Sequence, residues 1–322
     1  MKPITNIIYL PFVAVILAIG VLTASGTPAV APALRPTPTP RPIPTPRPRP
    51  VALRVITTFD YPGTGNLTRP QKINDTNDIV GGYVDSSGVT RGFVRFSDGT
   101  FSAPIVDPND TCNTTLARGI NNSRLICGDY ASGAGCTTLH GFFLMGNNFS
   151  QFDVPGSLST EVGGVNNVGD FCGSFTDATG FTQGFVSLGG AITSFSVPGS
   201  TFNAAYQLNS SNQLEGYYLD GSGIGHGYYR DADGTLHFPI DAPRSTFTVL
   251  FGNNDSNWMV GRYGDTAGTT HGLFFVPPNS FFTFDYPGST FTSLNGINAL
   301  GFICGRYTDA SGIDHGIIVR VE

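Results

Sequence analysis

Lysine, methionine and helical periodicity are all scarce in this sequence. The chain of 322 residues has three methionines and only two lysines, Lys2 and Lys72. No segment after the first 25 residues keeps apolar side chains at the i, i+3, i+4 and i+7 spacing over three turns, which argues against long helices. Glycine (42 residues) and phenylalanine (25) are instead abundant, and short aromatic or β-branched runs alternate with Gly, Asn and Asp. This composition predicts an all-β protein.

The charge of the chain is unevenly distributed. Six of the 17 basic side chains lie in residues 1–54, which contain no acidic residue, so residues 55–322 carry 11 basic and 23 acidic groups and a net charge of −12. A surface with this excess of negative charge repels the phosphate backbone of nucleic acids, and no cluster of basic residues interrupts it. We therefore expect no nucleic-acid partner.

Residues 1–26 have the pattern of a secretory signal peptide. Lys2 precedes an apolar run over residues 7–22, and small residues occupy positions 24–26. The run has 16 residues and contains Pro11, whereas a membrane-spanning helix needs about 20 apolar residues. Cleavage is therefore favoured over the alternative, an uncleaved N-terminal anchor, which would be the only membrane contact. Both alternatives predict a secreted or cell-envelope protein.

Residues 27–52 form a proline-rich segment, with proline at every second position over residues 36–50. Proline fixes the backbone φ angle and lacks an N–H donor, so a run of this kind favours the extended polyproline II conformation. We expect a disordered or polyproline II linker here.

The remaining residues, 53–322, contain one sequence unit six times, with a period of 43 to 49 residues. Each unit has a glycine, an asparagine seven residues before it and an aromatic residue two residues after it. The glycines are Gly81, Gly128, Gly173, Gly216, Gly261 and Gly305, and the asparagines are Asn74, Asn121, Asn166, Asn209, Asn254 and Asn298. A repeat of this length indicates an array of supersecondary units.

Each unit also contains three turn signals. The first lies three residues after the asparagine, where five units have Asn or Gly and one has Arg124. The second is an Asp-x-x-Gly sequence in five units, and the third is a pair such as Asp98-Gly99. Asn and Gly tolerate the left-handed backbone of tight hairpins, and Asp accepts hydrogen bonds within its own turn. Three hairpins join four strands, and four-stranded sheets at this period are typical of β-propeller blades.

The two ends of the repeat array complement each other. The sixth unit ends at Glu322, after the third of its four expected strands, residues 317–321. A strand-like segment at residues 53–59 precedes the first unit and can supply the missing fourth strand. Such closure removes open sheet edges. The sequence therefore predicts a six-bladed β-propeller of four-stranded blades over residues 53–322, closed by its N-terminal strand.

Three short motifs recur within the units. The sixth unit has Gly-Ile-Asn at 296–298, Ile-Cys-Gly at 303–305 and His-Gly-Ile at 315–317, and the second unit has close counterparts at 119–121, 126–128 and 140–142. These motifs resemble the extracellular HAF-family repeat, which has a Gly-Ile-Asn start, an Ile-Val-Gly strand and a His-Ala-Phe triplet. Glycine stands at the alanine position of that triplet throughout this chain. The resemblance implies an exported propeller and supplies no catalytic residue.

Four histidines occupy one repeat position, directly before the second glycine of their units: His140, His226, His271 and His315. Equivalent positions in different blades lie around the ring, whereas metal ligands must converge to within ~2.0–2.1 Å of one ion. We therefore expect these histidines to make structural hydrogen bonds, with the Asp-x-x-Gly turn as a partner, and the repeated asparagines to form turns. No metal site, cofactor or catalytic residue is predicted.

The five cysteines are of two kinds. Cys127, Cys172 and Cys304 share one repeat position at which other units have valine, so we expect them to be buried and free. Cys112 and Cys136 lie outside the repeat pattern, both in the second unit. Export would allow a disulfide between them.

Candidate binding residues are found where the units differ from one another. Three residues before the asparagine, on the expected innermost strand, the units read Gln71, Arg118, Gly163, Tyr206, Phe251 and Asn295. Glu215 is a second deviation, because its counterparts are Val or Cys. Innermost strands converge on the axis, where several blades can contact one small ligand. We therefore predict a binding site that comprises Gln71, Arg118, Tyr206, Asn295 and Glu215, although drift of channel-filling residues would give the same pattern.

Three kinds of function fit this architecture. The first is an extracytoplasmic, non-enzymatic module that binds a glycan or a protein, which we expect to be a monomer. The second is a lactonase-like or glycosidase-like hydrolase, and the third is a structural coat or matrix protein. Propeller glycosidases need paired carboxylates, and the only internal glutamates of residues 53–322 are Glu161 and Glu215. The binding module is therefore favoured.

Overall fold

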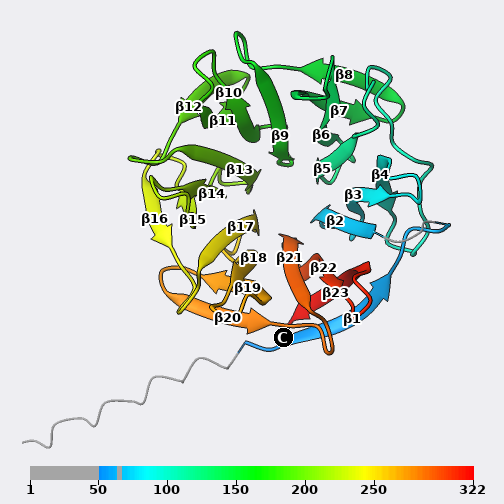
Figure 1. Ribbon diagram of the computed structural model, residues 1–322, viewed down its shortest axis with the longest axis vertical. Coiled ribbons are helices and arrows are strands. Elements are labelled where there is room, and N and C mark those ends of the chain that lie inside the picture. Colours follow the sequence, from blue (N-terminus) through cyan, green and yellow to red (C-terminus); the bar gives the residue numbers. More distant parts are fainter. Residues whose placement is uncertain (1–50, 64–66) are drawn as a thin grey trace, which may run out of the picture. The chain divides into compact units, whose positions relative to one another are not determined.

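The computed structural model describes residues 51–63 and 67–322, and these residues form strands and turns but no helix. Antiparallel pairing divides the strands into six groups around one central axis (Figure 1). The signal peptide and most of the linker, predicted for residues 1–26 and 27–52, lie outside the described residues. Within the described residues, no helix is long and apolar enough to cross a membrane. The prediction of an all-β propeller is confirmed.

Each antiparallel group, here called a blade, corresponds to one sequence unit. Blade 1 contains β2 (Leu67–Ile73), β3 (Ile79–Val84) and β4 (Thr90–Arg95), and blade 2 contains β5 (Leu116–Ile120), β6 (Ile126–Ser132), β7 (Thr138–Met145) and β8 (Asn148–Phe152). Blade 3 contains β9 (Ser159–Val165), β10 (Phe171–Thr176), β11 (Thr182–Leu188) and β12 (Ala191–Phe195). Blade 4 contains β13 (Phe202–Leu208), β14 (Leu214–Leu219), β15 (Gly225–Arg230) and β16 (Leu236–Ile240). Blade 5 contains β17 (Phe247–Asn253), β18 (Met259–Gly264), β19 (Thr270–Val276) and β20 (Ser280–Phe284). Blade 6 contains β21 (Phe291–Ile297), β22 (Phe302–Thr308), β23 (Asp314–Val321) and β1 (Leu53–Phe59).

The N-terminal strand closes the ring as the sequence predicts. Strand β1 pairs antiparallel with β23, from Leu53 opposite Val321 to Phe59 opposite Gly316. The two chain segments continue to pair beyond the strands, since the N–H of Glu322 donates to the carbonyl of Ala52 at 2.9 Å. The last blade is thus built from both ends of the described chain.

Blade 1 differs from the predicted four-stranded pattern. Its outer edge consists of two isolated bridges, Arg95 with Phe101 and Gly92 with Ile105, instead of a continuous fourth strand. Pro104 lies within this segment. Proline cannot donate to a strand ladder and is confined to sheet edges, which explains why the outer segment of this blade pairs only at intervals.

A β-bulge recurs in the innermost strand of every blade. Pairing between β2 and β3 passes from Pro70 to Lys72 and leaves Gln71 unpaired. The corresponding residues of the other blades are Arg118, Gly163, Tyr206, Phe251 and Asn295. The repeated glycine lies opposite the bulge, where an added Cβ would stand between 1.8 and 2.4 Å from a carbonyl oxygen of the innermost strand in all six blades. The repeated glycine is therefore required by the bulge, and a bulge redirects the side chain at its centre.

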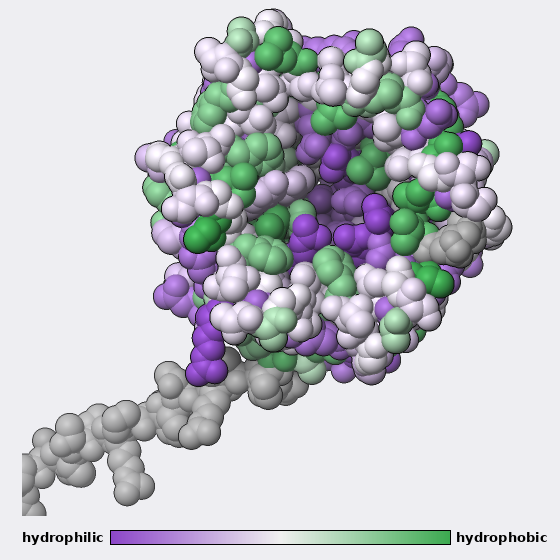
Figure 2. Space-filling model, in the orientation of Figure 1, coloured by the Kyte–Doolittle hydropathy of each residue, from purple (hydrophilic) through white to green (hydrophobic). Residues whose placement is uncertain are grey.

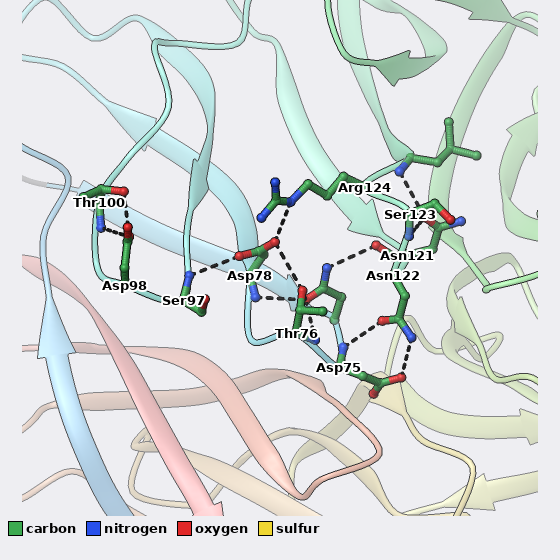
Figure 3. Close-up of polar contacts among 12 residues, drawn as sticks. Asp75, Thr76, Asp78, Ser97, Asp98, Thr100, Asn121, Asn122, Ser123 and Arg124 are labelled. Carbon is green, nitrogen blue, oxygen red and sulfur yellow. Dashed lines mark hydrogen bonds and ion pairs between the residues drawn. The ribbon is translucent and has the colours of Figure 1, made fainter.

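The first turn of each unit has the predicted left-handed residue. The backbone φ angles at these six positions lie between 58° and 92°. Arg124 adopts this conformation as well, with φ of 61°. Its guanidinium lies 2.7 Å from Asp78 (Figure 3). The same group lies 5.1 Å from the ring centroid of Phe96. The unit with Arg124 thus departs from the others in residue type but not in backbone conformation.

The repeated asparagines connect neighbouring blades in a closed ring of hydrogen bonds. Each side-chain oxygen accepts from backbone N–H groups of its own turn, as predicted. Each side-chain amide donates to the backbone carbonyl of the asparagine in the next blade, from Asn74 to Asn121 at 3.1 Å and onward to Asn298, which donates to Asn74 at 2.9 Å. Asp75 and Asn122 strengthen the first junction with two further hydrogen bonds (Figure 3). The sequence predicted the turns but not this ring.

The repeated histidines make the structural contacts that were predicted. In blade 5, His271 Nε2 lies 3.2 Å from Asp265 of the Asp-x-x-Gly turn, and Nδ1 lies 2.9 Å from Asp285. Asp285 lies directly after β20, in the segment that leads into blade 6. The sequence did not predict this second partner. His226 and His315 each contact two equivalent aspartates, one in the Asp-x-x-Gly turn and one in the segment that leads into the next blade. His140 contacts Asp153, which follows β8.

The cysteines pair as expected from the sequence. Cys112 and Cys136 form a disulfide with a Cα–Cα separation of 5.7 Å, and Cys127, Cys172 and Cys304 are buried and free. The disulfide connects the entry to blade 2 with the loop between β6 and β7.

Replacing both Cys112 and Cys136 by serine should lower the free energy of unfolding by about 3 kcal/mol, because the bond closes a loop of 24 residues in the unfolded chain. Chemical denaturation with and without reductant checks this value, since reductant should not destabilise the double variant further. Peptide mapping without reduction should show the bond directly. Free thiols at both positions in the native protein would contradict the prediction.

Candidate functional site

The bulge residues converge at one end of the axis, where the protein has a cavity of about 390 Å³. The innermost strands β2, β5, β9, β13, β17 and β21 surround the centre of the ring (Figure 1). The face shown in Figure 2 is hollowed at this centre, and hydrophilic residues line the hollow. The cavity is lined by the bulge residues Gln71, Arg118, Tyr206, Phe251 and Asn295 and by Arg69, Asp129, Arg262 and Arg306 of the same or adjacent strands. We call it the axial cavity.

Arg118 is held between two carboxylates. Its Nε contacts Asp129 on β6, and its guanidinium lies 2.9 Å from Glu161 on β9. Burial favours neutral arginine, but the charges of Asp129 and Glu161 outweigh burial and raise the pKa of Arg118. Burial also raises the pKa of Glu161, and Arg118 opposes that increase. This cluster fixes the orientation of Arg118 and leaves it little capacity to neutralise a further anion.

Arg69 and Arg306 share a single acidic partner. Both approach Asp314 on β23, at 2.9 Å and 2.5 Å, and the hydroxyl of Thr308 donates to the same carboxylate at 2.6 Å. Burial lowers the pKa of Arg306 to about 10, an effect that Asp314 opposes and that the charges of Arg69 and Arg262 reinforce. Two arginines with one carboxylate leave this wall of the cavity with excess positive charge.

Arg262 on β18 has no acidic partner among the described residues, and its buried Nε makes no hydrogen bond. The guanidinium carbon lies 5.1 Å from the ring centroid of Phe251 and 5.5 Å from that of Phe291. Burial lowers the pKa of Arg262. The aromatic wall continues through Tyr206, whose ring centroid lies 5.1 Å from that of Phe251.

Four of the five predicted binding residues line the axial cavity: Gln71, Arg118, Tyr206 and Asn295. Asn295 is largely buried, and its amide donates to the carbonyl of Pro70 at 2.7 Å, so it also ties blade 6 to blade 1. Glu215 does not line the cavity. It is fully buried, because its repeat position faces the interior, where the other blades have Val or Cys.

Beneath the axial cavity lies a buried lysine that the sequence analysis did not identify. Lys72 is 3 % exposed, and its Nζ donates to the carbonyls of Phe251 at 2.6 Å and Asn295 at 3.3 Å. At the repeat position of Lys72, four of the other five blades have glycine, and the absence of side chains there leaves room near the axis for the lysine side chain. Burial lowers the pKa of Lys72, and the nearby Glu215 opposes this change.

The most informative cavity residues missing from the prediction share one repeat position, directly after the repeated glycine. This position holds Gly82, Asp129, Ser174, Tyr217, Arg262 and Arg306. Its residues are as variable and as polar as those at the bulge position. This variation in the sequence would have indicated Arg262 and Arg306 as candidate binding residues. Lys72 could have been found as one of only two lysines, at a position that is mostly glycine.

The opposite end of the axis is narrower. A space of about 50 Å³ is lined there by the ring of repeated asparagines and the residues that follow them. In the part of the chain that the structure describes, no group of three or more His, Cys, Asp or Glu side chains could hold a metal ion. The axial cavity is therefore the better candidate for a site that accepts an organic ligand.

Comparisons with solved structures show the fold of the chain. A variant of the Aleuria aurantia lectin in complex with Fucα1-6GlcNAc matches with a TM-score of 0.52 at 10% sequence identity, over 80% of this chain and 96% of the lectin. AofleA from Arthrobotrys oligospora matches with a TM-score of 0.52 at 10% identity, over 83% of this chain and 86% of that protein. No family model matches the chain, and no curated protein matches it. The structural neighbours support the β-propeller, and the resemblance to the HAF-family repeat stays a prediction.

Proposed function

We propose that this protein is an extracytoplasmic, non-enzymatic binding module that holds a glycan in the axial cavity. The observation that carries this proposal is the convergence of Gln71, Arg118, Tyr206 and Phe251 from four blades on one cavity. A volume of about 390 Å³ falls in the range of ~300–1,000 Å³ that is usual for small-molecule sites. Such a cavity suits one or two sugar residues better than the surface of a protein partner.

The residue types in the cavity also favour a sugar. Aromatic faces such as those of Tyr206 and Phe251 can pack on the apolar face of a sugar ring, and arginine and amide groups can bind its hydroxyl groups. The Aleuria aurantia lectin, which shares the fold, is a carbohydrate-binding protein in complex with Fucα1-6GlcNAc. Location outside the cytoplasm is supported by the predicted signal peptide and by the disulfide between Cys112 and Cys136.

Binding is favoured over hydrolysis by the state of the carboxylates near the cavity. Asp129 and Glu161 are paired with Arg118, and Asp314 is paired with Arg69 and Arg306. A glycosidase needs one carboxyl group to donate a proton and another to act as base or nucleophile. Carboxylates held by arginine serve that purpose poorly, whereas they position the arginines well for recognition.

Substitution of Tyr206 by alanine should weaken glycan binding at least tenfold, because the loss of its ring removes one of the two aromatic faces of the cavity wall. The full chain can be screened on a glycan array, and the affinity of the best ligand measured by calorimetry for the parent and the variant. Phe238→Ala on β16 is the matched control, since it removes a ring that is 38% exposed and outside the cavity. Equal affinity of parent and Tyr206→Ala would place the site elsewhere.

A further inference from the structure

The axial cavity carries more positive than negative charge, although residues 55–322 have a net charge of −12. Four arginines line it, and three carboxylates contact these arginines. The imbalance is local. Two carboxylates, Asp129 and Glu161, are paired with Arg118, so the wall formed by blades 1, 5 and 6 has three arginines and the single carboxylate of Asp314.

The three arginines of that wall act on one another. The charges of Arg69 and Arg262 both lower the pKa of Arg306. Arg262 and Arg306 also flank the same ring, at 5.5 Å and 4.7 Å from the centroid of Phe291. Like charges in a partly buried site repel one another, and a bound anion would relieve this repulsion more strongly than it could in open solvent.

Arg262 is the group best placed to bind such an anion. It lines the cavity and has no carboxylate partner among the described residues, and its buried Nε makes no hydrogen bond, so its hydrogen-bonding capacity is the least used of the three arginines. A guanidinium presents parallel N–H donors that match the two oxygens of a carboxylate. The neighbouring rings of Phe251 and Tyr206 offer an apolar surface next to this group.

We infer that the ligand of the axial cavity is a sugar bearing a carboxylate, with the carboxylate bound by Arg262 beside Arg306 and the sugar ring packed against Tyr206 and Phe251. This inference rests on the proposed function, whose ligand class it specifies. A neutral sugar would leave the excess charge of Arg69, Arg262 and Arg306 uncompensated. An acidic sugar satisfies the charge and the aromatic wall together.

The test compares two probes with the same sugar backbone in titration calorimetry with the full chain: digalacturonate, which carries two carboxylates, and its uncharged dimethyl ester. We expect the acid to bind at least tenfold more tightly than the ester at low ionic strength. Arg262→Gln should reduce the affinity for the acid at least tenfold and the affinity for the ester by a much smaller factor, so that the preference for the acid is lost. Arg262→Lys should retain part of the preference, because it keeps the charge but not the planar pair of donors.

Arg230→Gln is the matched control. Arg230 also lies over a phenylalanine ring, 5.3 Å from the centroid of Phe195, but does not line the cavity, so this substitution should not change binding. Equal affinity for acid and ester, or an unchanged preference in Arg262→Gln, would overturn the inference while leaving glycan binding intact. Failure of the acid, the ester and neutral digalactose to bind, together with no other glycan bound on the array, would contradict the proposed function itself. Thermal melting of each variant confirms that it is folded.

Discussion

Replacing Lys72 by methionine should lower the free energy of unfolding by about 3–6 kcal/mol. The ammonium group donates to the carbonyls of Phe251 and Asn295, in blades 5 and 6, from its own position in blade 1. Hydrogen bonds from charged groups contribute about 1.5–3 kcal/mol each, and both carbonyls would be left without this partner. Methionine keeps the length of the side chain, so the effect should reflect the lost donors rather than an empty space. Urea unfolding at neutral pH measures it.

Glu215 provides the contrast to Lys72. Both of its carboxylate oxygens are buried without a hydrogen-bond partner, and burial raises its pKa to about 8 although Lys72 opposes the change. Glu215→Val installs the residue found at this position in blades 1 and 5, as Val80 and Val260. It should stabilise the protein by about 1–3 kcal/mol, since it removes unsatisfied polar atoms. If Glu215→Val instead destabilised the ring as strongly as Lys72→Met, the two residues would form a required ion pair.

The pH dependence of stability separates these alternatives further. Because the folded pKa of Glu215 lies above its usual value of 4.5, unfolding releases a proton between pH of about 4.5 and 8. The contribution of Glu215 to stability therefore falls as pH rises through this window. Lys72 has the opposite effect. Because burial lowers its pKa, its contribution to stability rises as the pH increases. The difference in the free energy of unfolding between Glu215→Val and the parent should therefore grow from acidic to mildly alkaline pH.

The sequence predicted the parts of this protein that are repeated. Gly81 and its counterparts, the left-handed turn residues and the split last blade all recur at fixed spacing, because each follows from backbone geometry that every blade must satisfy. Gly216 shows this directly, since any side chain there would collide with the carbonyl of Ala204. Even the position of the axial cavity could be predicted, because the bulge residues are the variable position nearest the axis.

The interactions within the cavity could not be predicted in the same way. Asp314 forms ion pairs with both Arg69 and Arg306. These two arginines belong to the first and the last blade, so they meet only when the ring closes. Repeat spacing gives the blade and the strand of a residue, but not the neighbour that it faces across the axis. Glu215 shows what repeat spacing cannot predict. Its difference from the Val or Cys of the other units is visible in the sequence, but the burial of its side chain depends on where that position lies in the folded blade.

Deletion of residues 51–60 should destabilise the whole ring by on the order of 5–8 kcal/mol. The loss includes the half-buried side chains of Leu53, Val55 and Phe59, at about 1 kcal/mol each, and the backbone hydrogen bonds to β23, at about 0.5–1.5 kcal/mol each. For a domain of this size that corresponds to a decrease in the melting temperature of more than about 10 °C. Differential scanning calorimetry measures it, and deletion of ten residues from the proline-rich segment, 36–45, is the control.

A circular permutant tests whether the loss arises from the missing strand itself. The N–H of Glu322 donates to the carbonyl of Ala52 in the structure, so the two ends of blade 6 lie where a hairpin turn would join them. A chain that begins at Leu67, continues to Glu322 and returns through an Asn-Gly turn into residues 52–63 would present β1 to β23 in the same register. We expect this permutant to recover most of the stability lost on deletion. If it melted at the temperature of the deletion variant although β1 was present, strand pairing would not be what closes the ring.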